Sequence, residues 1–288
     1  MKPFDYLSPT TLAEAASAWS DTGRTARLLA GGTDLTVALR HGHLAADVVI
    51  DLKRVDEFAD GIAATPQGLR IPATATMKAL GRYLEDRGLL PSLEEAAAVV
   101  GSVQIRNRAT LAGNICNASP AADTVPVLAA FGASVEVHGP SGVRQRLVAD
   151  FIEGNRKIDL APGEIVTAVV IPLPDGPRGC AFDRITRRRG VDLASANLCC
   201  TITKAGEVTF AFGAVAPRPL VVRDETGVLA DPTAGKEDRA RAIAGLIAAA
   251  TPISDIRASA RYRMAMLAVM AERSLLRARN RLQEAMNG

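Results

Sequence analysis

Two segments rich in small residues contain the residue types best suited to hold a phosphorylated ligand. Glycines let main-chain N–H groups approach a ligand closely, and the start of a helix adds a partial positive charge. Together these features favour a site for a phosphate or pyrophosphate, whereas the alternative is a tight strand-to-helix turn without a ligand. The first segment, the glycine turn, consists of Ala30, Gly31, Gly32, Thr33, Asp34 and Leu35.

The second segment, the small-residue loop, runs from Thr110 to Asp123 and combines hydroxyls, side-chain amides and one carboxylate. Such a loop can donate hydrogen bonds to phosphates and ribose, while Asp123 accepts from hydroxyls. The alternative is a loop that caps itself, with Asp123 capping the helix that follows. Among its fourteen residues are Thr110, Ala112, Gly113, Asn114, Asn117 and Asp123.

The sequence gives little indication of a standard nucleotide-binding fingerprint, a catalytic residue pair, a metal site or a cysteine cluster. Neither segment matches a G-x-G-x-x-G fingerprint or a P-loop, and no acid–base dyad or nucleophile–base pair has convincing spacing. His41 and His43 lack further ligands nearby, so we expect a helix C-terminus there and no metal site. The four cysteines have no C-x-x-C spacing, which favours buried thiols over a cluster or disulfides in a reducing cytoplasm.

The overall composition narrows the class of protein. With 48% hydrophobic and 23% charged residues, the chain is typical of a soluble globular protein. A net charge of +3 without a basic stripe gives no indication of a nucleic-acid partner. Neither a signal peptide nor a run long enough to span a membrane occurs, so we expect a cytoplasmic protein.

The surrounding sequence predicts the elements that position these segments. The glycine turn lies between an expected strand at 27–30 and a helix at 34–40, and further strands are expected at 48–52, 69–71, 134–138 and 164–171. Helices are expected at 77–87, 93–100 and 123–131, with an ordered loop at 104–123. After a boundary at 172–177, a hairpin at 193–215 precedes a helical region from about 236.

The order of several motifs and the residues within them resemble those of the FAD-binding medium subunit of the molybdenum hydroxylases. This family includes carbon monoxide dehydrogenase, the xanthine dehydrogenases, and bacterial hydroxylases of quinoline and nicotine, and the resemblance covers nearly the full length. The matching segments are 4–15, 30–35, 49–52, 104–114, 118–123, 187–189, 192–194, 215–219 and 255–263.

The resemblance implies an α+β fold: a two-subdomain FAD-binding unit of the PCMH (vanillyl-alcohol-oxidase-like) type, followed by a C-terminal domain with a small antiparallel sheet and helices. We place the N-terminal subdomain at 1–56, the second subdomain at 57–176 and the C-terminal domain at 177–288. Ala112 stands where the family usually has glycine, so we predict a negative φ at that position.

The resemblance also implies where FAD lies. The glycine turn would wrap the pyrophosphate, while Thr110, Gly113, Asn114 and Asn117 would line a second wall. Asp123 would face a hydroxyl or the flavin. Arg184 and Arg188 belong to a segment, 184–193, that would lie near the isoalloxazine ring and restrict access to it. For any of the three arginines 187–189, a solvated basic turn or a subunit contact is the alternative.

As a member of this family, the chain would transfer electrons within a complex. It would take them from [2Fe-2S] clusters of a small subunit and pass them through FAD to an external acceptor. A large subunit with the molybdenum cofactor would hydroxylate an N-heteroaromatic compound or oxidise a small substrate such as CO. A dimer of heterotrimers is expected. The alternatives are a self-contained FAD oxidoreductase of the same class and a scaffold subunit without flavin.

Overall fold

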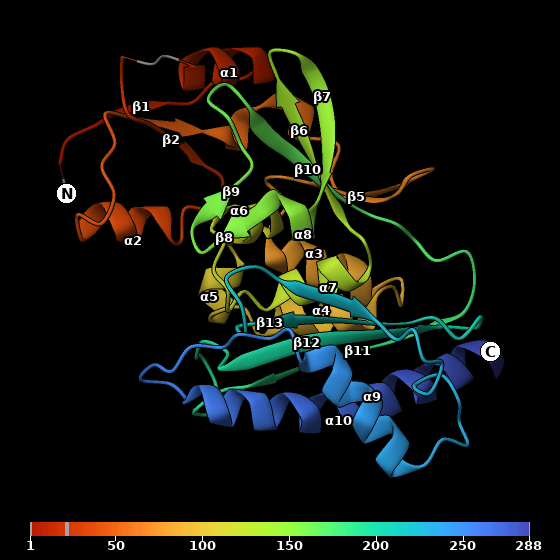
Figure 1. The fold of residues 1–288 in the computed structure, drawn as a ribbon. Coiled ribbons are helices and arrows are strands. Elements are labelled where there is room, and N and C mark those ends of the chain that lie inside the picture. Colours follow the sequence, from red (N-terminus) through yellow and green to blue (C-terminus); the bar gives the residue numbers. More distant parts are fainter. Residues whose placement is uncertain (1, 21–22, 288) are drawn as a thin grey trace.

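The N-terminal part of the chain forms a small parallel sheet, with two helices connected to it (Figure 1). The computed structural model describes residues 2–20 and 23–287. The strand order is β1-β3-β2, and both pairings are parallel. All four residues of the central strand are buried, which is typical of a parallel strand covered on both faces. The elements are β1 (Asp5–Leu7), α1 (Leu12–Ser20), β2 (Ala26–Leu29), α2 (Leu35–Arg40) and β3 (Val48–Asp51).

The middle part contains a five-stranded antiparallel sheet with the order β4-β5-β10-β6-β7. Its strands are β4 (Ala63–Thr65), β5 (Gly68–Pro72), β6 (Ser134–Gly139), β7 (Gly142–Leu147) and β10 (Ile165–Ile171). Between them lie α3 (Met77–Glu85), α4 (Pro91–Ala98), α5 (Val103–Arg106), α6 (Leu111–Cys116), α7 (Thr124–Ala130) and α8 (Val148–Phe151). A short hairpin of β8 (Ile152–Gly154) and β9 (Lys157–Ile158) follows α8.

The C-terminal part is a four-stranded antiparallel sheet between two layers of helices (Figure 1). Helices α4 and α7 pack on one face, and the long helix α10 packs on the other. Because both faces are covered, alternate residues of β12 enter different cores: Cys199 faces α4 and α7, whereas Leu198 and Cys200 face α10. The elements are β11 (Arg178–Ile185), β12 (Ala196–Thr203), β13 (Val208–Gly213), β14 (Leu220–Arg223), α9 (Lys236–Ile247) and α10 (Ala260–Asn287).

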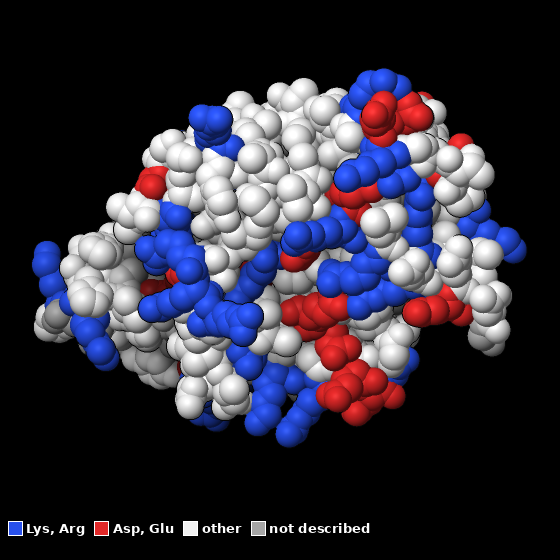
Figure 2. Space-filling view, turned by 90° about the horizontal axis from the view of Figure 1, so that it is seen from below, with Lys and Arg blue, Asp and Glu red and all other residues white. Residues whose placement is uncertain are grey.

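The face of the protein on the side of α10 carries both positive and negative side chains (Figure 2). Figure 2 shows Lys and Arg in groups on either side of a largely uncharged area, with Asp and Glu beside them. Ion pairs join elements of this part of the protein, as between Arg239 of α9 and Glu272 of α10, whose N and O atoms are 2.7 Å apart. Within 2–20 and 23–287, no helix has the length and apolar character needed to cross a bilayer.

Most expected elements are present, and the α+β fold is confirmed. The expectation of an ordered loop over 104–123 was wrong, because this stretch contains α5 and α6. Hydroxyl groups start both helices: Ser102 Oγ accepts from the Ile105 amide at 3.3 Å, and Thr110 Oγ1 accepts from the Gly113 amide at 3.0 Å. Small polar residues that looked irregular therefore act as helix caps.

Candidate functional site

The glycine turn connects the end of β2 to the start of α2, as predicted. Gly32 has φ of +77°, a conformation that favours glycine. Gly31 needs glycine for another reason, since a Cβ atom there would lie 2.2 Å from the Arg108 carbonyl oxygen and 2.9 Å from Ala109 Cα. Both glycines are therefore required by the backbone geometry.

Main-chain donors of the glycine turn remain available. In the part of the chain that the structure describes, the N–H groups of residues 31–34 have no hydrogen-bond acceptor. Residues 31–33 are half-buried. Adjacent main-chain donors that have no acceptor within the protein can converge on an anion, so this row suits a phosphate or pyrophosphate.

Lys53 holds the first residue of the glycine turn, whereas the side chain of Asp34, at the start of α2, is left unbonded among the described residues. The Ala30 carbonyl accepts from Lys53 Nζ at 3.5 Å, and Lys53 also pairs with Asp51 at 2.5 Å. Asp34 occupies the N-cap position of α2 but its exposed side chain makes no capping bond, and Leu35 is the first residue of the helix. Sequence reasoning missed Lys53, although it directly follows the 49–52 motif.

The small-residue loop begins where the glycine turn touches the chain. Gly31 packs against the main chain at residues 108 and 109, and Thr110 is the next residue along. The Ala109 carbonyl accepts from the Met77 amide at 2.8 Å, which anchors this contact to α3. The structure therefore brings together two segments that lie far apart in the sequence.

Polar side chains in the small-residue loop are partly engaged with the protein. Thr110 caps α6, and Asn114 Oδ1 accepts from the Thr124 hydroxyl at 2.7 Å. Asn117 Oδ1 accepts from Arg156. Ala112 lies inside α6 and is not among the residues with positive φ, so the prediction of a negative φ is confirmed.

Asp123 forms a buried cluster with Arg184 and Asn197. Arg184 Nη1 lies 2.7 Å from Asp123 Oδ2, and Asn197 Nδ2 lies 3.1 Å from Asp123 Oδ1. Burial raises the pKa of the Asp123 carboxyl, although Arg184 and Asn197 act in the opposite direction. Asp123 stands at the N-cap position of α7 without a side-chain capping bond, so the alternative of a self-capping loop was wrong for this residue.

Asn197 was missed by sequence reasoning. It is fully buried in β12, and its only sequence signal is one amide within an apolar run. Its neighbour across the sheet is Gly213, where an added Cβ atom would lie 2.2 Å from Asn197 Oδ1. The glycine therefore makes room for the amide.

Arg188 forms no hydrogen bond with the Asp123 cluster among the described residues. It is exposed and donates to the Val191 carbonyl at 2.8 Å through Nη2. Arg187 pairs with Asp192 at 3.2 Å in the same loop. The basic segment thus closes on itself between β11 and β12.

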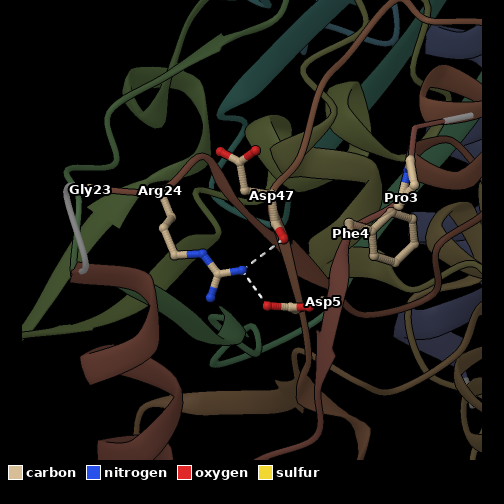
Figure 3. A pocket seen from close by; sticks show the side chains of 6 residues that line it. All are labelled: Pro3, Phe4, Asp5, Gly23, Arg24 and Asp47. Atoms are coloured by element: carbon tan, nitrogen blue, oxygen red, sulfur yellow. Dashed lines mark hydrogen bonds and ion pairs between the residues drawn. The ribbon is translucent and has the colours of Figure 1, made fainter.

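Two hollows in the described surface lie away from both segments. One, of about 510 Å³, is lined by Pro3, Phe4, Asp5, Gly23, Arg24 and Asp47 (Figure 3). There Arg24 Nη2 binds Asp5 at 2.5 Å and the Asp47 carbonyl at 3.2 Å. A second, of about 370 Å³, lies at the end of α2 and includes His41, which follows the helix as expected. Neither hollow is lined by the glycine turn or the small-residue loop, so the unpaired main-chain donors, and not a concave surface, mark the candidate site.

Comparison with protein families decides the class. Residues 2–174 match the FAD binding domain in molybdopterin dehydrogenase, and residues 181–278 match the CO dehydrogenase flavoprotein C-terminal domain.

The chain belongs to the family of FAD-binding medium subunits of molybdenum-dependent dehydrogenases.

Individual relatives of this family are similar over almost the whole chain. The carbon monoxide dehydrogenase medium chain of Afipia carboxidovorans is 31% identical, over 96% of this chain and 97% of its own. The 6-hydroxypseudooxynicotine dehydrogenase complex subunit alpha of Paenarthrobacter nicotinovorans is 30% identical, over 98% and 97%. The structure of quinoline 2-oxidoreductase from Pseudomonas putida 86 is similar with a TM-score of 0.89 and 27% identity, over 99% of this chain and 100% of the matched one.

The residues of this chain fit the cofactor that its family binds. A pyrophosphate needs several donors close together, and the free N–H groups of residues 31–34 supply them at the start of α2. Gly31 and Gly32 leave the main chain uncovered by side chains at this point. Ribose and ring atoms need mixed donors and acceptors, which the adjoining small-residue loop contains.

Proposed function

We propose that the glycine turn holds the FAD pyrophosphate and that this chain passes electrons from [2Fe-2S] clusters of a small subunit to an external acceptor. The free main-chain donors at 31–34, next to the small-residue loop, carry the proposal. When bound, FAD can take up and release electrons singly or in pairs, which suits a junction between clusters and an acceptor.

The chain's own residues would bind and orient the cofactor. Ala30 and Leu35 flank the donor row, in which Gly31, Gly32, Thr33 and Asp34 would direct their N–H groups at the pyrophosphate. On the second wall, Thr110 and Ala112 shape the start of α6, and Gly113 adds no side chain where a Cβ atom would lie 2.9 Å from Thr110 Oγ1. Asn114 and Asn117 each use Oδ1 within the protein and keep an amide NH₂ for the ligand.

Arg184 and Asp123 would set the charge beside the ring. Paired at 2.7 Å, they present a polar surface with little net charge. A guanidinium near the flavin favours its anionic reduced form, and the carboxylate moderates that effect. Arg188, on the loop between β11 and β12, would restrict access from solvent.

The assembly follows from the family. The chain partners a large subunit with the molybdenum cofactor and a small subunit with [2Fe-2S] clusters, and we propose a dimer of heterotrimers in the cytoplasm. The relatives are named for oxidation of CO and of 6-hydroxypseudooxynicotine, and a structural neighbour for quinoline. We propose an N-heteroaromatic compound or CO as the substrate class.

We also propose that 1–56, 57–176 and 177–288 are the structural units, with FAD between the first two.

Purification of the native assembly tests this function. We expect FAD, molybdenum and iron to co-purify with this chain, with one FAD per copy. FAD without molybdenum or iron would favour a self-contained FAD oxidoreductase instead. A colourless assembly that takes up no added FAD would favour a scaffold subunit, and the proposal would be abandoned.

A further inference from the structure

Helix α10 contains a buried arginine that bonds to groups outside the helix. Arg263 is 3% exposed. Its guanidinium donates to the carbonyl oxygens of Ser195 and Ala214, the latter at 3.3 Å, and to Asp255 Oδ1 at 2.7 Å. One side chain therefore fixes a residue just before β12, a residue just after β13 and the segment that precedes α10.

The two carbonyl residues bond to the small-residue loop and to the main chain beside Arg184. The Ala214 amide donates to the Pro120 carbonyl in the small-residue loop at 2.7 Å, and Ala214 has φ of +59°. The Ser195 amide donates to the Ile185 carbonyl at 2.7 Å, next to Arg184. Arg263 therefore holds the main chain at two residues, one bonded to the small-residue loop and one bonded to the residue after Arg184.

Asn197 continues this connection. In the sheet, Asn197 of β12 lies opposite Arg184 of β11 on one side and opposite Gly213 of β13 on the other. Its Nδ2 group donates to the Ala122 carbonyl at 3.3 Å and to Asp123 Oδ1 at 3.1 Å. A shift of the strand ends would therefore move the amide that holds Asp123.

We propose that Arg263, with Asp255, is a positioning residue for residues 118–123 of the small-residue loop. It fixes the ends of β12 and β13, so that Asn197 holds Asp123 and Ala214 holds Pro120. The inference rests on the proposed function, in which this loop lines the FAD site.

The choice of arginine supports a geometric role. A planar guanidinium can bridge several acceptors at fixed angles, whereas the ammonium group of lysine offers one point charge. Burying a charge is costly, and apolar residues often stabilise a core as well or better. Arg263 Nε even lacks a partner among the described residues. A residue needed only to fill space would not require this group.

The test is a double-mutant cycle of Arg263→Met and Asp123→Asn, made in the native assembly. The readouts are the Kd for FAD after removal of the cofactor and the thermal midpoint. We expect Arg263→Met to weaken FAD binding by about 3- to 10-fold and the double variant to lose less than the product of the two single effects, because coupled residues are not additive.

Arg279→Met is the matched control. Arg279 also lies on α10 and donates to main-chain carbonyls, those of Leu229 at 2.6 Å and Asp231 at 2.8 Å, but neither belongs to the site. It should lower the thermal midpoint without changing the Kd, and its effect should multiply with that of Asp123→Asn. If Arg263→Met does not fold, Arg263→Lys replaces it, with a smaller loss of affinity expected.

The outcomes separate the two proposals. A wild-type assembly that binds FAD, together with an Arg263→Met variant of unchanged Kd, would overturn the positioning role alone. Effects of Arg263→Met and Asp123→Asn that simply multiply would also overturn it. A wild-type assembly that fails to bind added FAD would overturn the proposed function and, with it, the role of Arg263.

Discussion

The glycine turn and the Asp123 cluster contain polar groups in opposite states. In the glycine turn, the main-chain donors of 31–34 are unpaired among the described residues. In the Asp123 cluster, both carboxylate oxygens already have partners, Asn197 for one and Arg184 for the other. Donors without a protein partner gain new hydrogen bonds when a ligand binds, whereas groups that are already paired mainly stabilise the protein around them. We therefore expect affinity for FAD to depend on the turn and stability to depend on the cluster.

The largest expected effect on affinity comes from Gly31→Ala. The added Cβ atom would lie 2.2 Å from the Arg108 carbonyl oxygen, so the turn must move away from the small-residue loop. Overpacking of this kind costs about 1–3 kcal/mol, which would weaken FAD binding by about 5- to 150-fold. A fluorescence titration of FAD measures the Kd. Gly81→Ala, with no atom within 4 Å of its new Cβ, is the control and should bind normally.

A smaller effect is expected for Gly32→Ala. At φ of +77°, alanine costs about 1–2 kcal/mol, which would weaken FAD binding by about 5- to 30-fold. Gly42 has φ of +73° and open space around it, so Gly42→Ala carries the same backbone cost away from the turn. Equal losses of affinity in both variants would show that the turn has no special part in binding.

The Asp123 cluster should respond in the opposite way. Asp123→Asn removes the charge that faces Arg184, and loss of a charged hydrogen bond destabilises a protein by about 1.5–3 kcal/mol. Its effect on FAD should be limited to one neutral hydrogen bond, about 0.5–1.5 kcal/mol, or about 2- to 12-fold. Urea unfolding and FAD titration on the same preparation separate the two effects. Complete loss of FAD from a folded variant would reverse the assignment of roles.

The smallest effect concerns acid pH. Burial acts to raise the pKa of Asp255, but the amides of Arg257 and Ala258 and the Arg263 guanidinium outweigh it and lower the pKa to about 2. Since the folded pKa lies below the ordinary value of 3.8, the stabilisation is present above 3.8 and is lost as the pH falls towards about 2. Asp255→Asn should show a flatter loss of thermal stability over this range. A variant curve parallel to the wild-type curve would count against this role of Asp255.

The sequence predicted the fold well where periodicity and family motifs agree. The buried run of β3 and the β12–β13 hairpin follow from apolar patterns that need no knowledge of distant residues. The helices within 104–123 could not be predicted in this way. Ser102 and Thr110 cap short helices there, and the composition of the stretch is typical of a loop. Short capped helices depend on a single hydroxyl each, which is a weak signal in a sequence.

The candidate site shows the same limit. The glycine turn and the small-residue loop could be identified by residue type, but their contact depends on Gly31 meeting Arg108 in three dimensions. Asn197 could not be found in this way, because a lone amide in an apolar strand gives no indication of its partner. Its role follows only from the register that sets it beside Arg184 and Gly213.

Amide hydrogen exchange on the native assembly, with and without FAD, tests the central claim most directly. If the main-chain donors of the glycine turn bind the pyrophosphate, a peptide that covers 31–34 should exchange more slowly when FAD is bound. The turn at 204–207, between β12 and β13, should change less. Stoichiometric FAD binding with unchanged exchange at 31–34 would contradict the account.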